Sequence, residues 1–249
     1  MQLRAVLFGL FSVLLAGCAG APNYRSPTTE VRTPMMAPMM GRVGILSLLD
    51  NRIKHVHDGT VGGSEKSYDT QFDFNGFVIE ELRKGMLTKT PYQPVVVAPT
   101  GALLRAASTW QDTWNGKTFG GTFQREFEGI MAQNRLDMLV VVSCPEIDSG
   151  FGGEDLSGSG LYTRSFLGTT NAAVFSTLQF FRIVGKPAQL VVPVAPADDR
   201  SIGDLPHIAL PKELDDLPAR YLFPVYDPLR TIVRNKVAGF LSLPRKIGA

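Results

Sequence analysis

The stretch Asp137-Met138-Leu139-Val140-Val141-Val142-Ser143 decides the fold, because it is the clearest buried strand in the sequence. Its apolar residues follow one another without the alternation that marks a strand with one face in water. A similar run, Val43-Gly44-Ile45-Leu46-Ser47-Leu48-Leu49, is bounded by Gly41 and Asp50-Asn51 and begins the globular part. Continuous apolar runs of this kind are typical of strands covered on both faces.

Apolar residues at helical spacing supply covering elements for these strands. Proline or a small polar residue at the start of each segment marks where its helix begins. Helices are predicted from Phe74 to Met86 with Asp73 or Asn75 as cap, through Ala107 with Thr100 as cap, after Thr122 as cap, and from Pro228 with Asp227 as cap.

Shorter apolar segments predict the remaining strands. Asp50-Asn51 is a candidate turn that would join the first strand to Ile53–His57 in a hairpin, and Leu161–Phe166 is a candidate edge strand. Gly185-Lys186-Pro187 is flanked by two apolar runs and predicts a hairpin, whose second strand lies at an edge because it contains Pro193. The other predicted strands and loops are a strand at Val95–Val97, the hairpin strands Val174–Ile183 and Gln189–Val194, and loops at 59–70, 110–121 and 144–160.

Helices between apolar strands predict an α/β (α+β) fold, with a mixed β-sheet packed by amphipathic helices. We expect one globular domain over residues 41–249, after a flexible tether over 18–40. Proline interrupts the tether repeatedly, so it should be extended and semi-rigid. Its four methionines offer thioethers that suit Cu(I), although paired Met beside Pro is also ordinary linker composition.

Residues 1–17 have the features of a secretory signal peptide, with Arg4 followed by a short apolar run. The run from Ala5 to Ala16 is shorter than the ~20 residues that a membrane-spanning helix needs. Leu15-Ala16-Gly17-Cys18 resembles the lipobox of bacterial lipoproteins. The resemblance implies that Cys18 is acylated, becomes the first mature residue and inserts into membrane lipid. Ala19, in place of Asp, implies sorting to the outer membrane, facing the periplasm.

Charge and cysteine content exclude two classes of protein. The formal net charge is +2, and removal of the signal peptide takes away only Arg4. Because the basic residues are scattered, we expect no binding to nucleic acid. Once Cys18 is acylated, Cys144 is the only thiol left, so an intrachain disulfide is excluded.

The order of the elements is similar to a layout found in several envelope proteins. The strand Val43–Leu49, the helix around Glu80-Glu81-Leu82, the strand Tyr92–Val97, the strand Asp137–Val142 and a late hairpin follow one another. This order resembles the amino-terminal domain of the Tol-Pal translocation protein, the curli-secretion lipoprotein and the lipoprotein activators of penicillin-binding proteins. The resemblance implies an adaptor or secretion component without an active site. The His-Val-His strand, the glycine-rich loop and the extended C-terminal region depart from it.

Two places in the chain carry residues with catalytic or metal-binding chemistry. His55 and His57 lie on one face of a strand, where they are either two ligands of a metal site or a solvent-facing pair on an edge strand. The only other histidine is His207. Cys144 ends a buried strand and is either a nucleophile activated by one of these histidines or a small buried side chain.

The function expected from the sequence is therefore that of a lipid-anchored binding, assembly or accessory module of the cell envelope, without catalysis or cofactor. Its partner is another envelope protein or peptidoglycan. Contact is expected through the loop after the most apolar strand, at Gly150, Phe151, Glu154 and Asp155. The alternative is a periplasmic hydrolase or metal-binding protein that uses Cys144 or His55 and His57.

Overall fold

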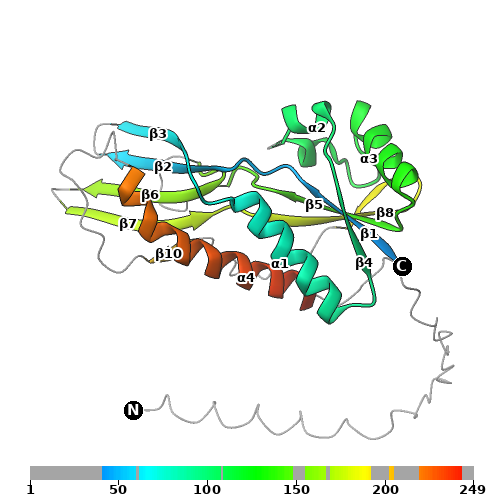
Figure 1. Cartoon of the computed structure of the whole chain (residues 1–249). Helices are drawn as coiled ribbons and strands as arrows, with labels where there is room; N and C mark the ends of the chain where they lie inside the picture. Colours follow the sequence, from blue (N-terminus) through cyan, green and yellow to red (C-terminus); the bar gives the residue numbers. More distant parts are fainter. Residues whose placement is uncertain are drawn as a thin grey trace, which may run out of the picture. The chain divides into compact units, whose positions relative to one another are not determined.

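The strands of this protein form two five-stranded sheets, each mixed, with helices packed against them (Figure 1). The computed structural model describes residues 41–59, 62–107, 109–147, 155–166, 169–191, 202–204 and 219–242. The predicted signal peptide and tether, residues 1–40, lie outside the described residues. The predicted α/β class with mixed sheets and amphipathic helices is confirmed, although two sheets are present where one was expected.

The first sheet contains both apolar runs that decide the fold. Its strands, in spatial order, are β4 (Gln93–Val97), β1 (Arg42–Ser47), β5 (Met138–Ser143), β8 (Gln179–Val184) and β9 (Gln189–Val191). β1 is parallel to β4 and β5, whereas β8 is antiparallel to β5 and β9. The β8–β9 hairpin and the edge position of its second strand are as predicted; Pro193 itself lies outside the described residues.

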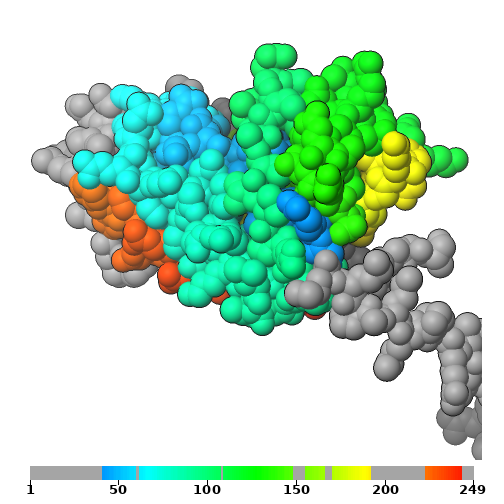
Figure 2. Space-filling model, turned by 45° about the vertical axis from the view of Figure 1, so that its right-hand side comes forward, coloured from blue at the N-terminus to red at the C-terminus, as the bar shows by residue number. Residues whose placement is uncertain are grey.

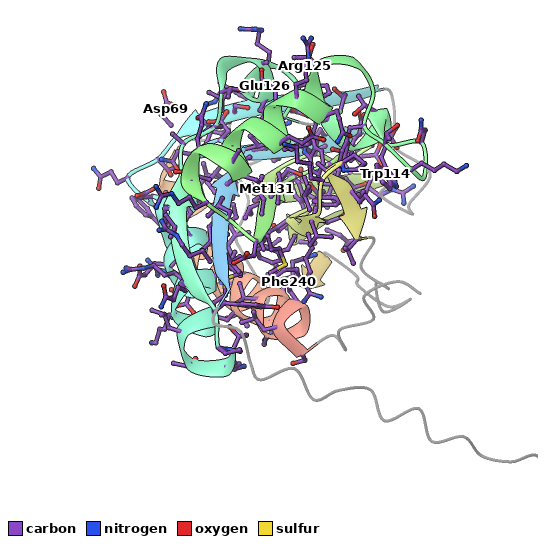
Figure 3. All side chains as sticks on the ribbon, turned by 90° about the vertical axis from the view of Figure 1, so that its right-hand side faces the viewer. Asp69, Trp114, Arg125, Glu126, Met131 and Phe240 are labelled. Atoms are coloured by element: carbon purple, nitrogen blue, oxygen red, sulfur yellow. The ribbon has the colours of Figure 1, made fainter. Side chains whose placement is uncertain are left out.

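Helices cover both faces of this sheet, as its apolar strands require. The helical elements are α1 (Phe74–Lys89), α2 (Gly101–Arg105), the 3-10 helix η1 (Trp110–Thr113), α3 (Gly121–Asn134), the 3-10 helix η2 (Ala219–Val225) and α4 (Tyr226–Ser242). Val43 and Val140 pack against α1 and α4, and Leu46 and Leu139 pack against α2, η1 and α3. In Figure 3, Met131 of α3 and Phe240 of α4 accordingly lie on opposite sides of the sheet.

Trp110 is the centre of the core between the sheet and α3. It is fully buried, and its ring meets those of Phe127 and Phe181 edge-on at centroid distances of 5.4 and 5.0 Å. Offset and edge-on aromatic contacts of this kind add to the free energy gained by burying the rings. The segment that carries Trp110 was predicted as a loop, and its first residues form η1 instead.

The second sheet consists of β3 (Gly62–Asp69), β2 (Arg52–Gly59), β6 (Ser159–Phe166), β7 (Thr169–Ser176) and β10 (Ile202–Asp204), in that spatial order. On one face, Ile53, Leu161 and Val174 pack against η2 and the beginning of α4. On the other face, Tyr162 and Phe175 pack with two residues that flank the loop after β5. This second sheet therefore has a core of its own, which shares α4 with the first.

Four predictions about the strands are wrong. Ile53–His57 forms no hairpin with Val43–Leu49, because the chain leaves the first sheet after β1 and enters the second at β2. The loop predicted over 59–70 contains β3, an edge strand whose side chains are almost all exposed and so have no apolar face. Leu161–Phe166 belongs to β6, which is central because it pairs with β2 and β7. Val174–Ile183 is divided between β7 and β8, in different sheets.

The helix starts agree with the sequence in part. Asp73 caps α1 through a 2.9 Å hydrogen bond from the Gly76 amide, and the Thr100 hydroxyl accepts one from the Leu103 amide. Gly120, rather than Thr122, occupies the cap position of α3. α4 begins at Tyr226, directly after η2, rather than at Pro228 with Asp227 as cap. Local cap residues thus locate a helix within a turn but do not fix its first residue.

The pairing of β2 with β6 depends on Gly160. A Cβ atom at this position would lie 1.8 Å from the carbonyl oxygen of Lys54, its partner in the register. We expect Gly160→Ala to lower the free energy of unfolding by about 3 kcal/mol or more, because backbone rather than a side chain must move. Urea denaturation measures this change.

Gly129→Ala is the matched control, since a Cβ atom there meets nothing within 4 Å on α3. It should raise the free energy of unfolding by about 0.5–1 kcal/mol through helix propensity. Equal stabilities for the Gly160→Ala variant and the wild type would contradict the close approach of β2 and β6.

Candidate ligand cleft

A cleft of about 210 Å³ lies where the two sheets meet, beside the carboxyl ends of β1 and β5. Figure 2 shows the place from outside, where the blue-to-cyan surface of β2 and β3 meets the green surface of α2 and α3 along a notched upper edge. Open α/β sheets place their ligands outside the carboxyl ends of parallel strands, where the connections diverge. The connection after β1 leads to the second sheet, and that after β4 leads into α2.

The cleft has an apolar wall. It is formed by Leu48 and Leu49 after β1, by Phe74 at the start of α1, and by Leu104 and Ala107 at and after α2. Leu104 is 52% exposed, whereas Leu48 and Phe74 are buried. Part of this wall is therefore apolar surface in contact with water, which a ligand would cover.

Charged groups line the opposite side of the cleft. The Arg52 guanidinium donates through Nε to Asp50 Oδ2 at 2.7 Å, and this hydrogen bond lowers the pKa of the Asp50 carboxyl. Lys54 Nζ lies 2.6 Å from Glu65 Oε1. Arg105, on α2, forms no ion pair or hydrogen bond with any residue that the structure describes, and it is exposed. One cation of the three is therefore left without a compensating anion.

Cys144 also lines the cleft, but its thiol is not activated. Burial raises the pKa of the thiol from its ordinary value of 9.0 to about 11, and the hydroxyls of Thr177 and Ser159 only partly offset this. The charged groups that act on the thiol are Lys236 and Lys54, and neither His55 nor His57 lies in the cleft. A cysteine nucleophile needs a lowered pKa or an adjacent base. Among the described residues, Cys144 has neither a lowered pKa nor a histidine beside it.

His55 and His57 both contact the hydroxyl of Thr163 in the second sheet. His55 Nε2 lies 2.8 Å and His57 Nδ1 lies 2.9 Å from Thr163 Oγ1. The expectation of a solvent-facing pair on an edge strand is wrong, because β2 lies between β3 and β6 and His55 is 1% exposed. The hydroxyl can donate its proton to only one imidazole at a time, so it must accept from the other if both contacts are hydrogen bonds.

The described residues contain neither a candidate metal site nor a helix that could cross a membrane. No group of three or more His, Cys, Asp or Glu side chains in the described part of the chain is placed to hold a metal ion; His207 lies outside that part. Among the described helices, none combines the length and apolar character that crossing a membrane requires.

Comparisons with protein-family models, with curated proteins and with solved structures find no match to this chain.

The predicted contact loop begins and ends at the cleft. Gly150, Phe151 and Glu154 lie outside the described residues, and Asp155 is exposed. Beside it, Leu156 pairs with Ile147 through two backbone hydrogen bonds of 2.8 Å.

The last residues assigned to the loop from the sequence are not part of it. Ser157 donates to the Cys144 carbonyl at 3.2 Å, and Ser159 begins β6. The loop is therefore shorter than 144–160, and Cys144 and Ser157, on either side of it, line the cleft.

Sequence reasoning missed the basic side of the cleft. Arg52, Lys54 and Arg105 were grouped with the scattered charges, because they are far apart in the sequence and form no motif. The signal that would have found Arg105 is its place a few residues after an apolar strand, where open sheets collect ligand contacts. Arg52 and Lys54 could not be placed there without knowing that the chain changes sheets after β1.

The raised thiol pKa predicts slow alkylation of Cys144. Thiolate is the reactive form, so at neutral pH the folded protein should react with iodoacetamide roughly a hundredfold more slowly than a cysteine of ordinary pKa. The rate should rise as the pH approaches 11. Mass spectrometry of the quenched reaction measures the rate against pH, with the urea-unfolded chain as the control. Equally fast labelling of folded and unfolded chains at neutral pH would show that the thiol is activated.

Proposed function

We propose that this protein is a membrane-anchored lipoprotein that faces the periplasm and acts as a binding, assembly or accessory module of the cell envelope, without catalysis. The observation that carries the proposal is Leu15-Ala16-Gly17-Cys18 at the end of a short apolar run. The acyl chains on Cys18 insert into the membrane, and dual acylation gives a stable anchor where one chain gives only marginal binding. Ala19 after the lipidated cysteine assigns the anchor to the outer membrane.

The tether sets how far the domain reaches from that membrane. Residues 18–40 separate the lipidated cysteine from β1. A proline-rich segment rises about 3.1 Å per residue, so a tether of this length spans several tens of ångströms when extended. The domain can then meet a partner that is not itself at the membrane surface, such as another envelope protein or peptidoglycan.

The cleft and its loop support binding rather than turnover. A hydrolase would need a nucleophile beside a base, or a metal with an open position. Cys144 has a raised pKa, and the two described histidines, His55 and His57, contact Thr163 and do not line the cleft. In contrast, Cys144 and Ser157, which lie on either side of the segment from Ile147 to Asp155, both line a cleft with an apolar wall. Loops held on a rigid scaffold are common sites of recognition.

The lipid anchor is tested by Cys18→Ala. We expect the variant to remain an unprocessed precursor that takes up no labelled palmitate, because the thiol is the acylation site. The wild type should be labelled and should partition into the detergent phase of a two-phase extraction. Ala19→Asp is the control for sorting, and it should retain the label while some protein moves to the inner membrane. Equal palmitate labelling of the wild type and Cys18→Ala would refute the anchor.

The same strains test binding at the envelope. A cell-permeant crosslinker should join the wild type to envelope proteins or to peptidoglycan, and deletion of residues 148–154 should abolish the crosslink while leaving acylation intact. Mass spectrometry identifies the captured component. An undiminished crosslink in the deletion strain would place the contact elsewhere on the domain.

A further inference from the structure

We infer that the cleft between the two sheets binds a small organic carboxylate that carries an apolar group, with Arg105 as the residue that receives the carboxylate. This inference does not depend on the lipid anchor, because it concerns only the described domain. Arg105, on α2, and Leu104 beside it are both exposed at the cleft. The cleft therefore presents one cation and one apolar side chain next to each other, and the cation has no ion pair with any described residue.

The charge balance selects a singly charged ligand. Asp50 is held by Arg52, and Glu65 is held by Lys54, so these four groups compensate one another. Cys144 adds no negative charge, because a thiol with a pKa of about 11 is protonated at neutral pH. Among the described residues that line the cleft, only the charge of Arg105 is then left to be matched. A guanidinium binds a carboxylate through two parallel hydrogen bonds. A carboxylate carries one negative charge, which matches the single unpaired cation, whereas a phosphate monoester would bring a second.

The size and lining of the cleft select the apolar group. Its volume is about 210 Å³, larger than the ~150 Å³ apolar cavity that accommodates benzene in an engineered protein. Leu49, Phe74 and Ala107 provide an apolar wall beside Leu104. A ligand with a phenyl ring or a short aliphatic chain would cover this wall and remove Leu104 from water, with a gain roughly proportional to the apolar area buried.

The groups around the cleft are held in place before a ligand arrives. The stem of Lys54 lies along Gly158, where a Cβ atom would be 3.1 Å from Lys54 Cδ. Gly158 in turn exchanges hydrogen bonds with Thr177, at 3.0 Å to the Thr177 hydroxyl and 2.9 Å from the Thr177 amide. A preformed wall lowers the entropic cost of binding a small molecule.

The experiment titrates the full acylated chain, in detergent, with 3-phenylpropanoate and follows backbone amide shifts by NMR. Saturable shifts are expected at Leu49, Leu104, Arg105 and Ser159. Two further probes separate the contributions: 3-phenylpropylamine has the same ring with the opposite charge, and acetate has the charge without the ring. Both should bind at least tenfold more weakly than 3-phenylpropanoate, because each lacks one of the two interactions.

Arg105→Gln should weaken 3-phenylpropanoate binding by about tenfold or more while leaving the unfolding midpoint unchanged, since the side chain is exposed. Arg125→Gln is the matched control, because Arg125 is an exposed arginine on α3 that does not line this cleft. Figure 3 shows Arg125 pointing outward. Leu104→Ala should weaken the 3-phenylpropanoate complex and leave the weak acetate response unchanged.

Three results would overturn the inference. They are no saturable shift with 3-phenylpropanoate at millimolar concentration, equal binding of the amine, and undiminished binding by Arg105→Gln. Partition of the probe into detergent would affect the wild type and the Arg105→Gln variant alike, so the difference between them reports the cleft. Equal palmitate labelling of the wild type and Cys18→Ala, which would refute the lipid anchor, would leave all of these expectations standing, so the two proposals are separable.

Discussion

The described strands change sheet five times along the chain, and the structure depends most on the two short crossings, from β1 to β2 and from β7 to β8. After β1 it runs through Leu48 to Asn51 and enters β2, and after β7 it runs through Thr177 and Leu178 and enters β8. In Figure 1 the two strands at each crossing follow one another nearly end to end. The Leu48 amide still donates to the Val142 carbonyl at 2.8 Å, and Leu178 is buried in the core of the first sheet. In both crossings, the connecting segment is therefore fixed to the first sheet.

The cleft is a consequence of these crossings. Because the strands of one sheet do not continue the pairing of the other, the carboxyl ends of β1 and β5 open onto a space that side chains only partly fill. α2 closes it on one side and β2 on the other, which brings Arg105 near residues more than fifty positions earlier in the sequence. The close approach of β2 to Gly160 then fixes the position of the wall formed by Lys54, Gly158 and Ser159.

The sequence predicted the first sheet well and the second poorly. Val43–Leu49 and Asp137–Ser143 are continuous apolar runs, and burial on two faces leaves that signature in any single sequence. β3 leaves no such signature, since it is an exposed edge strand of Gly, Ser, Glu and Lys held by backbone pairing to β2. The division of Val174–Ile183 between two sheets is equally invisible, because both halves are apolar and only long-range pairing separates them. The cleft residues share this limitation, as no local pattern joins Lys54 to Arg105.

The cleft is a preformed site only if the two sheets unfold together rather than one at a time, and this is the central claim. Native-state hydrogen exchange tests it most directly, because it measures the opening free energy of each strand separately. The slowest amides of β1 and β5 in the first sheet, and of β2 and β6 in the second, should exchange with the same free energy, equal to that of global unfolding. If β2 and β6 instead exchange with a free energy several kcal/mol lower, the second sheet opens on its own and the cleft is not a preformed site.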